Sequence, residues 1–181
     1  DLFHSNKNLQ IQFKKLIKNS KSNLKIIGNK ISLFKRIRFG IIYIDDQEYE
    51  PLHYHDGFIS FQIIIHGSCV LDECDKLEIK DNNIYYNKHH RVTLKENDVM
   101  LNYSQYRDIH GFGAINGPAY ILSIGKYNGI LGKFKISKSK LEINNRLYVD
   151  SSNSNRISER TYVSPLINEE EAYLKYSKLE N

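Results

Sequence analysis

Residues 51–68 read PLHYHDGFISFQIIIHGS, and the interpretation of the whole chain starts from this stretch. His53 and His55 stand two residues apart, and alternate residues of a β-strand point to the same face of a sheet. Both imidazoles can therefore face one side and share a metal ion. Histidines at this spacing also occur on surfaces and in cores, so the pair by itself leaves the metal site open.

Most of the chain beyond residue 30 has the texture of β-strands, because short runs rich in isoleucine, valine and tyrosine alternate with turn-forming residues. Turns are expected at His66-Gly67 and at Asn116-Gly117-Pro118. Many short strands joined by tight turns predict a mainly-β sandwich or barrel. We expect strands over residues 37–44, 58–65, 68–74, 76–80, 83–87, 90–95, 99–103, 111–115 and 120–126.

A second segment, DIHGFGAINGPAYILSIG at residues 108–125, supplies a distant third histidine, His110. A His-x-His pair, a glycine twelve residues later at Gly67 and a late histidine together resemble the two motifs of the cupin superfamily. Those proteins usually carry a glutamate where this chain has Ser60. The resemblance therefore implies a ligand set of three histidines without a fourth protein ligand.

Both segments also resemble one branch of the superfamily, the cysteamine dioxygenase and plant cysteine oxidase family. Its segments read PLHDHPGM and NIHCFRAITPCAVLDVLG, and its first motif likewise lacks the glutamate. Arg160-Thr161-Tyr162 looks like the CTYY stretch of that family. After the histidine of the second motif, the two sequences agree without a gap at Phe112, Ala114, Ile115, Ala119 and Gly125.

The resemblance implies a mainly-β cupin-type double-stranded β-helix (jelly-roll) barrel that holds one Fe(II) ion on His53, His55 and His110. It also implies that O2 oxidises the sulfur of cysteamine, or of an N-terminal cysteine of a peptide, to a sulfinic acid. The ligand set suits this chemistry, because imidazole binds iron and three ligands leave open positions for a thiol and O2. Metal coordination also deprotonates a bound thiol.

This sequence departs from the family at positions that bear on catalysis. The aspartate of the family falls at Leu122, the arginine of its second motif falls at Gly113, and its proline pair is missing. A shift of one residue would offer Ser123 in place of the aspartate, and Tyr127 could replace a tyrosine of the same stretch. Together with Tyr103, which is expected to line the cavity, these two residues are the catalytic candidates.

Helices are expected at the two ends of the chain. Residues 9–24 have the pattern of an amphipathic helix, and residues 169–179 that of a short terminal helix. The expected organisation is an N-terminal helical segment (1–30), a cupin barrel (31–165) and a C-terminal helical tail (166–181). Within it, residues 150–158 read as an exposed loop and residues 161–163 as an edge strand.

The bulk properties are those of a folded single domain. The 181 residues carry a scattered net charge of +5 and no nucleic-acid reader motif, so we do not expect nucleic-acid binding. The apolar runs are far shorter than the roughly 20 residues of a membrane span. Cys69 and Cys74 are too few for a disulfide framework, which predicts core packing and a reducing compartment. We expect a cytoplasmic protein, with a mitochondrial one as the alternative because the chain begins with Asp1.

Three functions stay open on the sequence. The first is the thiol dioxygenase, whose partners are a thiol substrate and O2. The second is a catalytically degenerate cupin that acts as a structural or interaction subunit of a larger protein complex. The third is a cupin of another chemistry, such as a metal-dependent isomerase or a small-molecule binding module. In none of them do we expect the remaining histidines to bind metal: His4, His66, His89 and His90.

Overall fold

The structure is a computed structural model, and it describes residues 24–27, 37–55, 58–102, 107–127 and 146–179. The helix expected over residues 9–24 lies outside the described residues except for Leu24, and Tyr103 also lies outside them. The described elements are β1 (Leu24–Ile27), β2 (Ile37–Ile44), β3 (Tyr49–His55), β4 (Phe58–Lys80), β5 (Asn83–Lys88), β6 (Val92–Leu94), β7 (Val99–Asn102), β8 (Ile109–Tyr127), β9 (Arg146–Val149), η1 (Ser151–Asn153), β10 (Asn155–Arg156), β11 (Thr161–Ile167) and α3 (Glu169–Tyr176).

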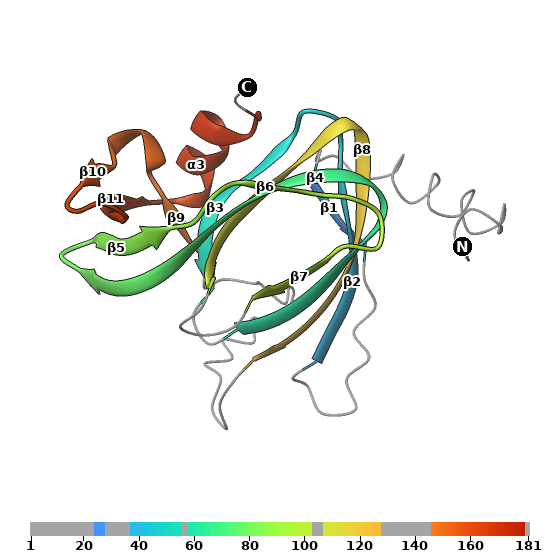
Figure 1. Ribbon diagram of the computed structural model, residues 1–181, viewed down its shortest axis with the longest axis horizontal. Coiled ribbons are helices and arrows are strands. Elements are labelled where there is room, and N and C mark those ends of the chain that lie inside the picture. The colour runs from blue at the N-terminus through green and yellow to red at the C-terminus, as the bar shows by residue number, and fades with distance from the viewer. Residues whose placement is uncertain (1–23, 28–36, 56–57, 103–106, 128–145, 180–181) are drawn as a thin grey trace, which may run out of the picture.

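Two long antiparallel strands, β4 and β8, form the frame of a barrel (Figure 1). Residues 58–64 of β4 pair with residues 121–127 of β8, and residues 68–74 pair with residues 109–115. We call the first of these paired regions the first wall of the barrel and the second the second wall. Strand β2 extends the first wall, and β3 extends the second. This is the cupin-type double-stranded β-helix that the sequence predicts.

The long strands bend where turns were expected. The sequence predicts turns at His66-Gly67 and Asn116-Gly117-Pro118, but the structure has irregular pairing inside continuous strands at both places. Gly67 has a φ of +82°, and a Cβ there would lie 2.5 Å from the carbonyl oxygen of Pro118. Only glycine fits this close crossing of the two strands, so Gly67 lets one strand belong to both walls.

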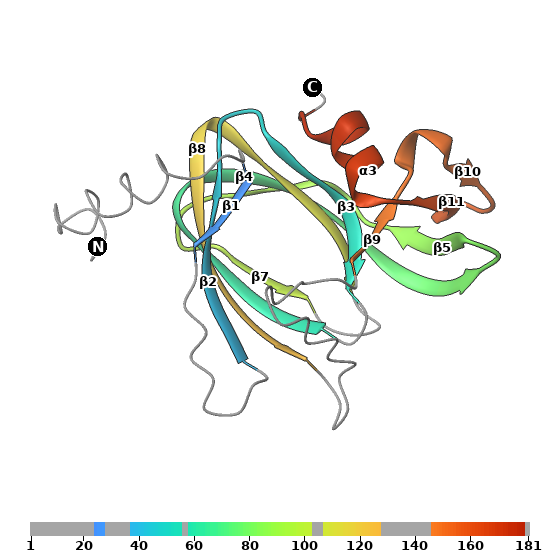
Figure 2. The same ribbon diagram turned by 180° about the vertical axis from the view of Figure 1, so that it is seen from behind.

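Two hydrophobic cores lie on opposite faces of the second wall. Ile44, Ile64, Leu71 and Phe112 belong to the core inside the barrel. The second core lies on the other face of β3 and β8 and is enclosed by β9, which pairs with the edge of β3, and by β11 and β5. These three strands lie to one side of the barrel in both views (Figures 1 and 2). It contains Leu52, Tyr54, Cys74, Ile84, Tyr86, Ile109 and Val149. Strand β3 therefore separates the two cores.

The C-terminal part is more regular than the sequence predicted. Strand β11 runs to Ile167 and pairs with β5, β9 and β10, so it is an inner strand and the expectation of an edge strand is wrong. Strand β9 and the short elements η1 and β10 were not predicted. The terminal helix is confirmed as α3, and Asn168 caps it by accepting a hydrogen bond from the Glu171 backbone N–H.

The N-terminal edge of the barrel is also longer than predicted. Strand β1 pairs antiparallel with β2, with Leu24 opposite Ile44, in a stretch that the sequence predicts to lie in the N-terminal helical segment (1–30). Among the described residues, no helix is long and apolar enough to cross a membrane.

Both cysteines are buried and unpaired, as expected, with Cys69 in the barrel core and Cys74 in the second core. Burial raises the pKa of each thiol to about 12, so neither forms a thiolate at neutral pH. We therefore expect the native protein to react with an aromatic disulfide reagent at least about a hundredfold more slowly than the denatured chain. Rapid modification of either thiol in native buffer would contradict this burial.

Candidate metal centre

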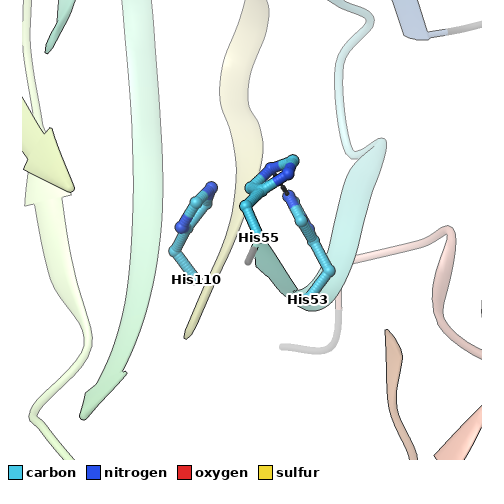
Figure 3. A group of neighbouring side chains, drawn as sticks. All are labelled: His53, His55 and His110. Carbon is cyan, nitrogen blue, oxygen red and sulfur yellow. Dashed lines mark hydrogen bonds between the residues drawn. The ribbon is translucent and has the colours of Figure 1, made fainter. Parts of the chain in front are cut away.

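The three predicted histidines come together on the inner face of the second wall. Strands β3 and β8 pair so that His53 stands opposite His110. His110 shares its strand face with Phe112 and Ala114, which belong to the barrel core. A register shift between Glu50 and His53 lets the end of β3 turn its histidines inward. Figure 3 shows the three imidazoles facing one another.

Their spacing fits a single ion. The Nε2 atoms of His53 and His55 lie 2.9 Å apart, and one nitrogen from each of the three rings falls in a group with mutual distances within 4.8 Å. Nitrogens bound to one ion at about 2.1 Å lie about 3 Å apart when adjacent and at most about 4.2 Å apart. The His53–His55 pair already has this geometry, and a small rotation of the rings would bring in His110.

The hydrogen bonds around His53 prepare it as a ligand. Its Nδ1 lies 2.8 Å from the carbonyl oxygen of Pro51, which can only accept, so Nδ1 carries the proton and Nε2 carries the lone pair. This lone pair points at His55 Nε2. A cation between the two nitrogens would be bound by both lone pairs, whereas without one His55 must donate a proton to His53. A backbone acceptor on the outer nitrogen is the usual support of a metal-bound imidazole.

Burial keeps the imidazoles of His53 and His110 neutral. The exposed fractions of His53, His55 and His110 are 1%, 9% and 3%. Burial lowers the pKa of His53 well below its usual value, and the neighbouring histidines and Arg146 add to this effect. Burial and then Arg146 lower the pKa of His110 to about 3. Neutral rings with available lone pairs are the form that binds a metal ion.

The metal-free protein should therefore lose stability in mild acid. Below about pH 6.5 the unfolded chain protonates His53 and His110 while the folded chain does not, so the free energy of unfolding falls as pH falls. The expected slope is up to about 1.4 kcal/mol per pH unit for each ring. Urea unfolding of the metal-free protein at several pH values between 7 and 5 measures it. His110→Leu should flatten the slope, and an unchanged slope would count against a buried neutral ring.

A buried ion pair lies directly behind His53. Glu50 is 0% exposed and its Oε1 lies 2.7 Å from Arg146 Nη1 and 3.7 Å from His53 Nδ1. Tyr173 of helix α3 donates to the other oxygen of Glu50. The ring of Tyr148 packs against His53 with 5.6 Å between centroids. Burial raises the pKa of Glu50, and Arg146 opposes that shift.

Sequence reasoning missed this group. Glu50 is an acid directly before the apolar start of the first motif, which was a signal that could have been used. Arg146 and Tyr148 lie far along the chain in a strand that was not predicted, and they reach the site only because β9 pairs with β3. Register places Tyr148 opposite His53 and Arg146 opposite His55.

The predicted catalytic candidates have different placements. Ser123 lies opposite Gln62 and shares a strand face with the core residue Ile121, so its register position is on the inner face. Leu122 lies opposite Ile63 on the other face. If the aspartate of the family is matched to Ser123 instead of Leu122, its position therefore lies on the inner face of the barrel and carries a polar side chain. Tyr127 ends β8, but its side chain and the whole of Tyr103 lie outside the described part of the chain.

The other described histidines are apart from this group. His66 lies 3.8 Å from Glu96 and packs near Tyr120, His89 bonds Asp75 at 2.8 Å, and His90 is exposed. Within the described residues, the only group with metal-ligand spacing is His53, His55 and His110. His4 lies outside them.

A separate pocket of about 240 Å³ lies on the opposite side of β3, between the barrel and the C-terminal segment. Leu52, Cys74, Arg91 and Tyr176 are among its lining residues, and none of the three histidines is. Because Leu52 and His53 point to opposite faces of β3, this pocket is not the space in front of the histidines.

No family model and no curated protein matches this sequence. Among solved structures, it is similar to the Schizosaccharomyces pombe Cnp3 cupin domain, with a TM-score of 0.47 and 9% identity over 62% of this chain and 72% of that one. The TT1209 protein from Thermus thermophilus gives a TM-score of 0.47 and 14% identity over 65% and 95%. A cupin superfamily protein from Desulfitobacterium hafniense gives 0.41 and 15% over 61% and 84%. Likeness at this level says nothing about activity.

Proposed function

We propose that this chain is a thiol dioxygenase-like protein that holds Fe(II) on His53, His55 and His110. In this proposal it oxidises the sulfur of cysteamine, or of an N-terminal cysteine, to a sulfinic acid. The observation that carries the proposal is the convergence of three buried imidazoles from two strands, with 2.9 Å between the Nε2 atoms of the first two. The sequence resemblance at both histidine motifs supports the choice of metal and substrate.

The absence of a carboxylate from the ligand set is consistent with a thiol substrate. Ser60, at the position of the usual cupin glutamate, is buried and accepts hydrogen bonds from two neighbouring amides. Three neutral ligands leave a bound Fe(II) with its full positive charge, which favours a thiolate as the next ligand. When bound, the iron would supply the coordination positions at which a thiolate and O2 meet, and the four electrons that reduce O2 would come from the sulfur as it becomes the sulfinic acid.

The roles of the protein residues follow from their contacts. Pro51 fixes the tautomer of His53 by accepting its Nδ1 proton. Glu50 and Arg146 neutralise each other behind that ring, so the buried site carries no net charge from this pair. The apolar core residue Phe112 stacks on His110 with 6.2 Å between centroids and shields it from water. These residues hold the ligands in place in a dry environment.

The experiment that tests the proposal loads the purified protein anaerobically with one equivalent of ferrous iron. Each thiol is then added with O2, oxygen consumption is followed, and sulfinic acid is identified by mass spectrometry. Iron bound at one per chain with sulfinic acid formed in step with oxygen uptake is the expected result. Iron binding without product removes the enzyme and keeps the metal site, whereas no metal binding removes both.

A second candidate function rests on Leu122. The position of the aspartate of the family carries an aliphatic side chain on the outer face of β8, and the adjacent inner position carries only Ser123. A chain that kept the barrel and lost this acid could serve as a structural subunit of a complex. In that case His53→Ala should leave its assembly with partners unchanged, as seen by co-purification and native mass spectrometry.

A further inference from the structure

A cluster of three buried polar side chains, two amides and one serine, lies on the inner face of the first wall; we call it the amide cluster. Ser60, Gln62 and Asn102 are 1%, 4% and 3% exposed. They alternate with outward-facing residues, and they share their strand faces with the core residues Ile64 and Met100. Register places Ser60 opposite Asn102, so the three side chains form one polar group on the inner face.

This group leaves acceptors without donors. Gln62 Nε2 and Asn102 Nδ2 both donate to Ser60 Oγ, at 3.4 and 3.2 Å. The carbonyl oxygens of both amides, Gln62 Oε1 and Asn102 Oδ1, are buried and have no hydrogen-bond partner within the part of the chain that the structure describes. Ser60 has a single hydroxyl hydrogen, so even if one amide were rotated, the oxygen of the other would keep no donor. A buried unpaired acceptor is costly, and such groups commonly mark a ligand or water site.

The amide cluster lies at the same end of the barrel as the histidines. Strand β3 ends at His55, and β4 begins three residues later, so Ser60 follows His55 by only five positions. Strand β7 ends at Asn102 and β8 begins at Ile109, next to His110. Three positions separate the end of β3 from the start of β4, and seven separate the end of β7 from the start of β8, so the strand ends of the histidine wall and of the amide wall are near in sequence. A ligand held by the histidines would therefore lie at the end of the barrel that also holds the amide oxygens.

We propose that Gln62 Oε1 and Asn102 Oδ1 form the subsite that receives the ammonium group of an aminothiol whose sulfur is held at the histidine site. An ammonium group has three donors and no acceptor, so it matches two carbonyl oxygens, whereas a carboxylate would meet only acceptors. This inference rests on the proposed function and deepens it. It assigns substrate selectivity to residues that neither the metal nor the sequence motifs identify.

The test measures thiol binding without turnover. The protein is loaded with Co(II), and the thiolate-to-cobalt absorption band is titrated with cysteamine, 2-mercaptoethanol and 3-mercaptopropionate. Hydrogen bonds to a charged group are among the stronger ones, so the double variant Gln62→Met/Asn102→Leu should bind cysteamine about ten- to a hundredfold more weakly. Its affinity for 2-mercaptoethanol, which has a neutral hydroxyl in place of the ammonium, should change by less than about threefold. Asn155→Leu, an exposed substitution on β10, is the matched control and should change neither affinity.

A second measurement separates a ligand subsite from a structural role. The metal-free double variant should melt within a few degrees of the wild type, because the removal of two unpaired buried acceptors offsets the two hydrogen bonds that Ser60 Oγ loses. Lower stability together with equal loss of affinity for all three thiols overturns the inference. So does wild-type binding without preference for cysteamine, which leaves the proposed function intact. Wild-type protein that holds Co(II) but binds none of the thiols overturns the inference and the proposed function together.

Discussion

His110→Leu is expected to abolish tight binding of a divalent transition metal, with an affinity loss of at least about a hundredfold. His53 and His55 alone would leave the ion with two protein ligands, and open metal sites in proteins normally need three. Substitution of a residue that only supports a metal ligand typically lowers metal affinity about ten- to a hundredfold. Loss of a direct ligand should therefore lower it by at least as much. Metal content after dialysis, followed by competition with a coloured chelator, measures the loss.

The matched control for this experiment is His90→Leu. His90 is exposed and is not in the histidine group, so its loss should leave metal content at the wild-type level. His110→Leu should also leave the metal-free fold intact, because His110 Nδ1 has no hydrogen-bond partner among the described residues and leucine suits the apolar neighbourhood of Phe112. Equal metal retention by the His110 variant and the wild type would remove the candidate centre.

Arg146→Met is expected to lower the free energy of unfolding by about 3–5 kcal/mol at neutral pH. The substitution leaves the fully buried carboxylate of Glu50 without its cation, and an unpaired buried charge is among the most costly defects in a protein. Metal affinity should fall by about ten- to a hundredfold as well, because Glu50 and Arg146 lie behind His53. Urea unfolding and the chelator competition provide the two measurements.

The pH dependence of this variant gives an internal check. Burial already raises the pKa of Glu50, and loss of Arg146 raises it further, so the folded variant takes up a proton before the unfolded chain does. The difference in the free energy of unfolding between the variant and the wild type should therefore become smaller as pH falls. The double variant Glu50→Gln/Arg146→Met should recover most of the stability. Glu171→Gln, which breaks an exposed i,i+4 ion pair with Lys175, should cost less than about 1 kcal/mol.

The sequence was informative where side-chain pattern and local spacing determine structure. The shared facing of His53 and His55 could be predicted because alternate residues of a strand point to the same side. The third histidine, His110, was predicted from the resemblance to the cupin motifs. The strand-rich composition predicted a mainly-β sandwich or barrel, and the resemblance at the histidine motifs selected the double-stranded β-helix barrel. Turns at Gly67 and Gly117 were misread, because the same residues that end a strand also permit a bend within one.

What the sequence could not supply is the pairing of distant segments. Arg146 approaches Glu50 because β9 pairs with the edge of β3. Nothing in the local sequence of β9, RLYV at residues 146–149, indicates which strand it pairs with. The amide group has the same origin, since Ser60 and Asn102 meet only through the register of β4 with β7. Single serine, glutamine and asparagine residues in apolar strands were visible, but their convergence was not.

Because β3 lies between the two cores, it couples the position of the histidines to the packing of the C-terminal layer. Its even-numbered residues Leu52 and Tyr54 are anchored in the C-terminal layer, while its odd-numbered histidines face the barrel. Glu50 extends the same link to Tyr173 of α3. Loosening the C-terminal layer, by cleavage or by a partner that draws α3 away, would thus shift the donor atoms themselves. Loss of the metal ion from the three histidines would then indicate that the C-terminal layer has been disturbed, although that layer does not contact the ion.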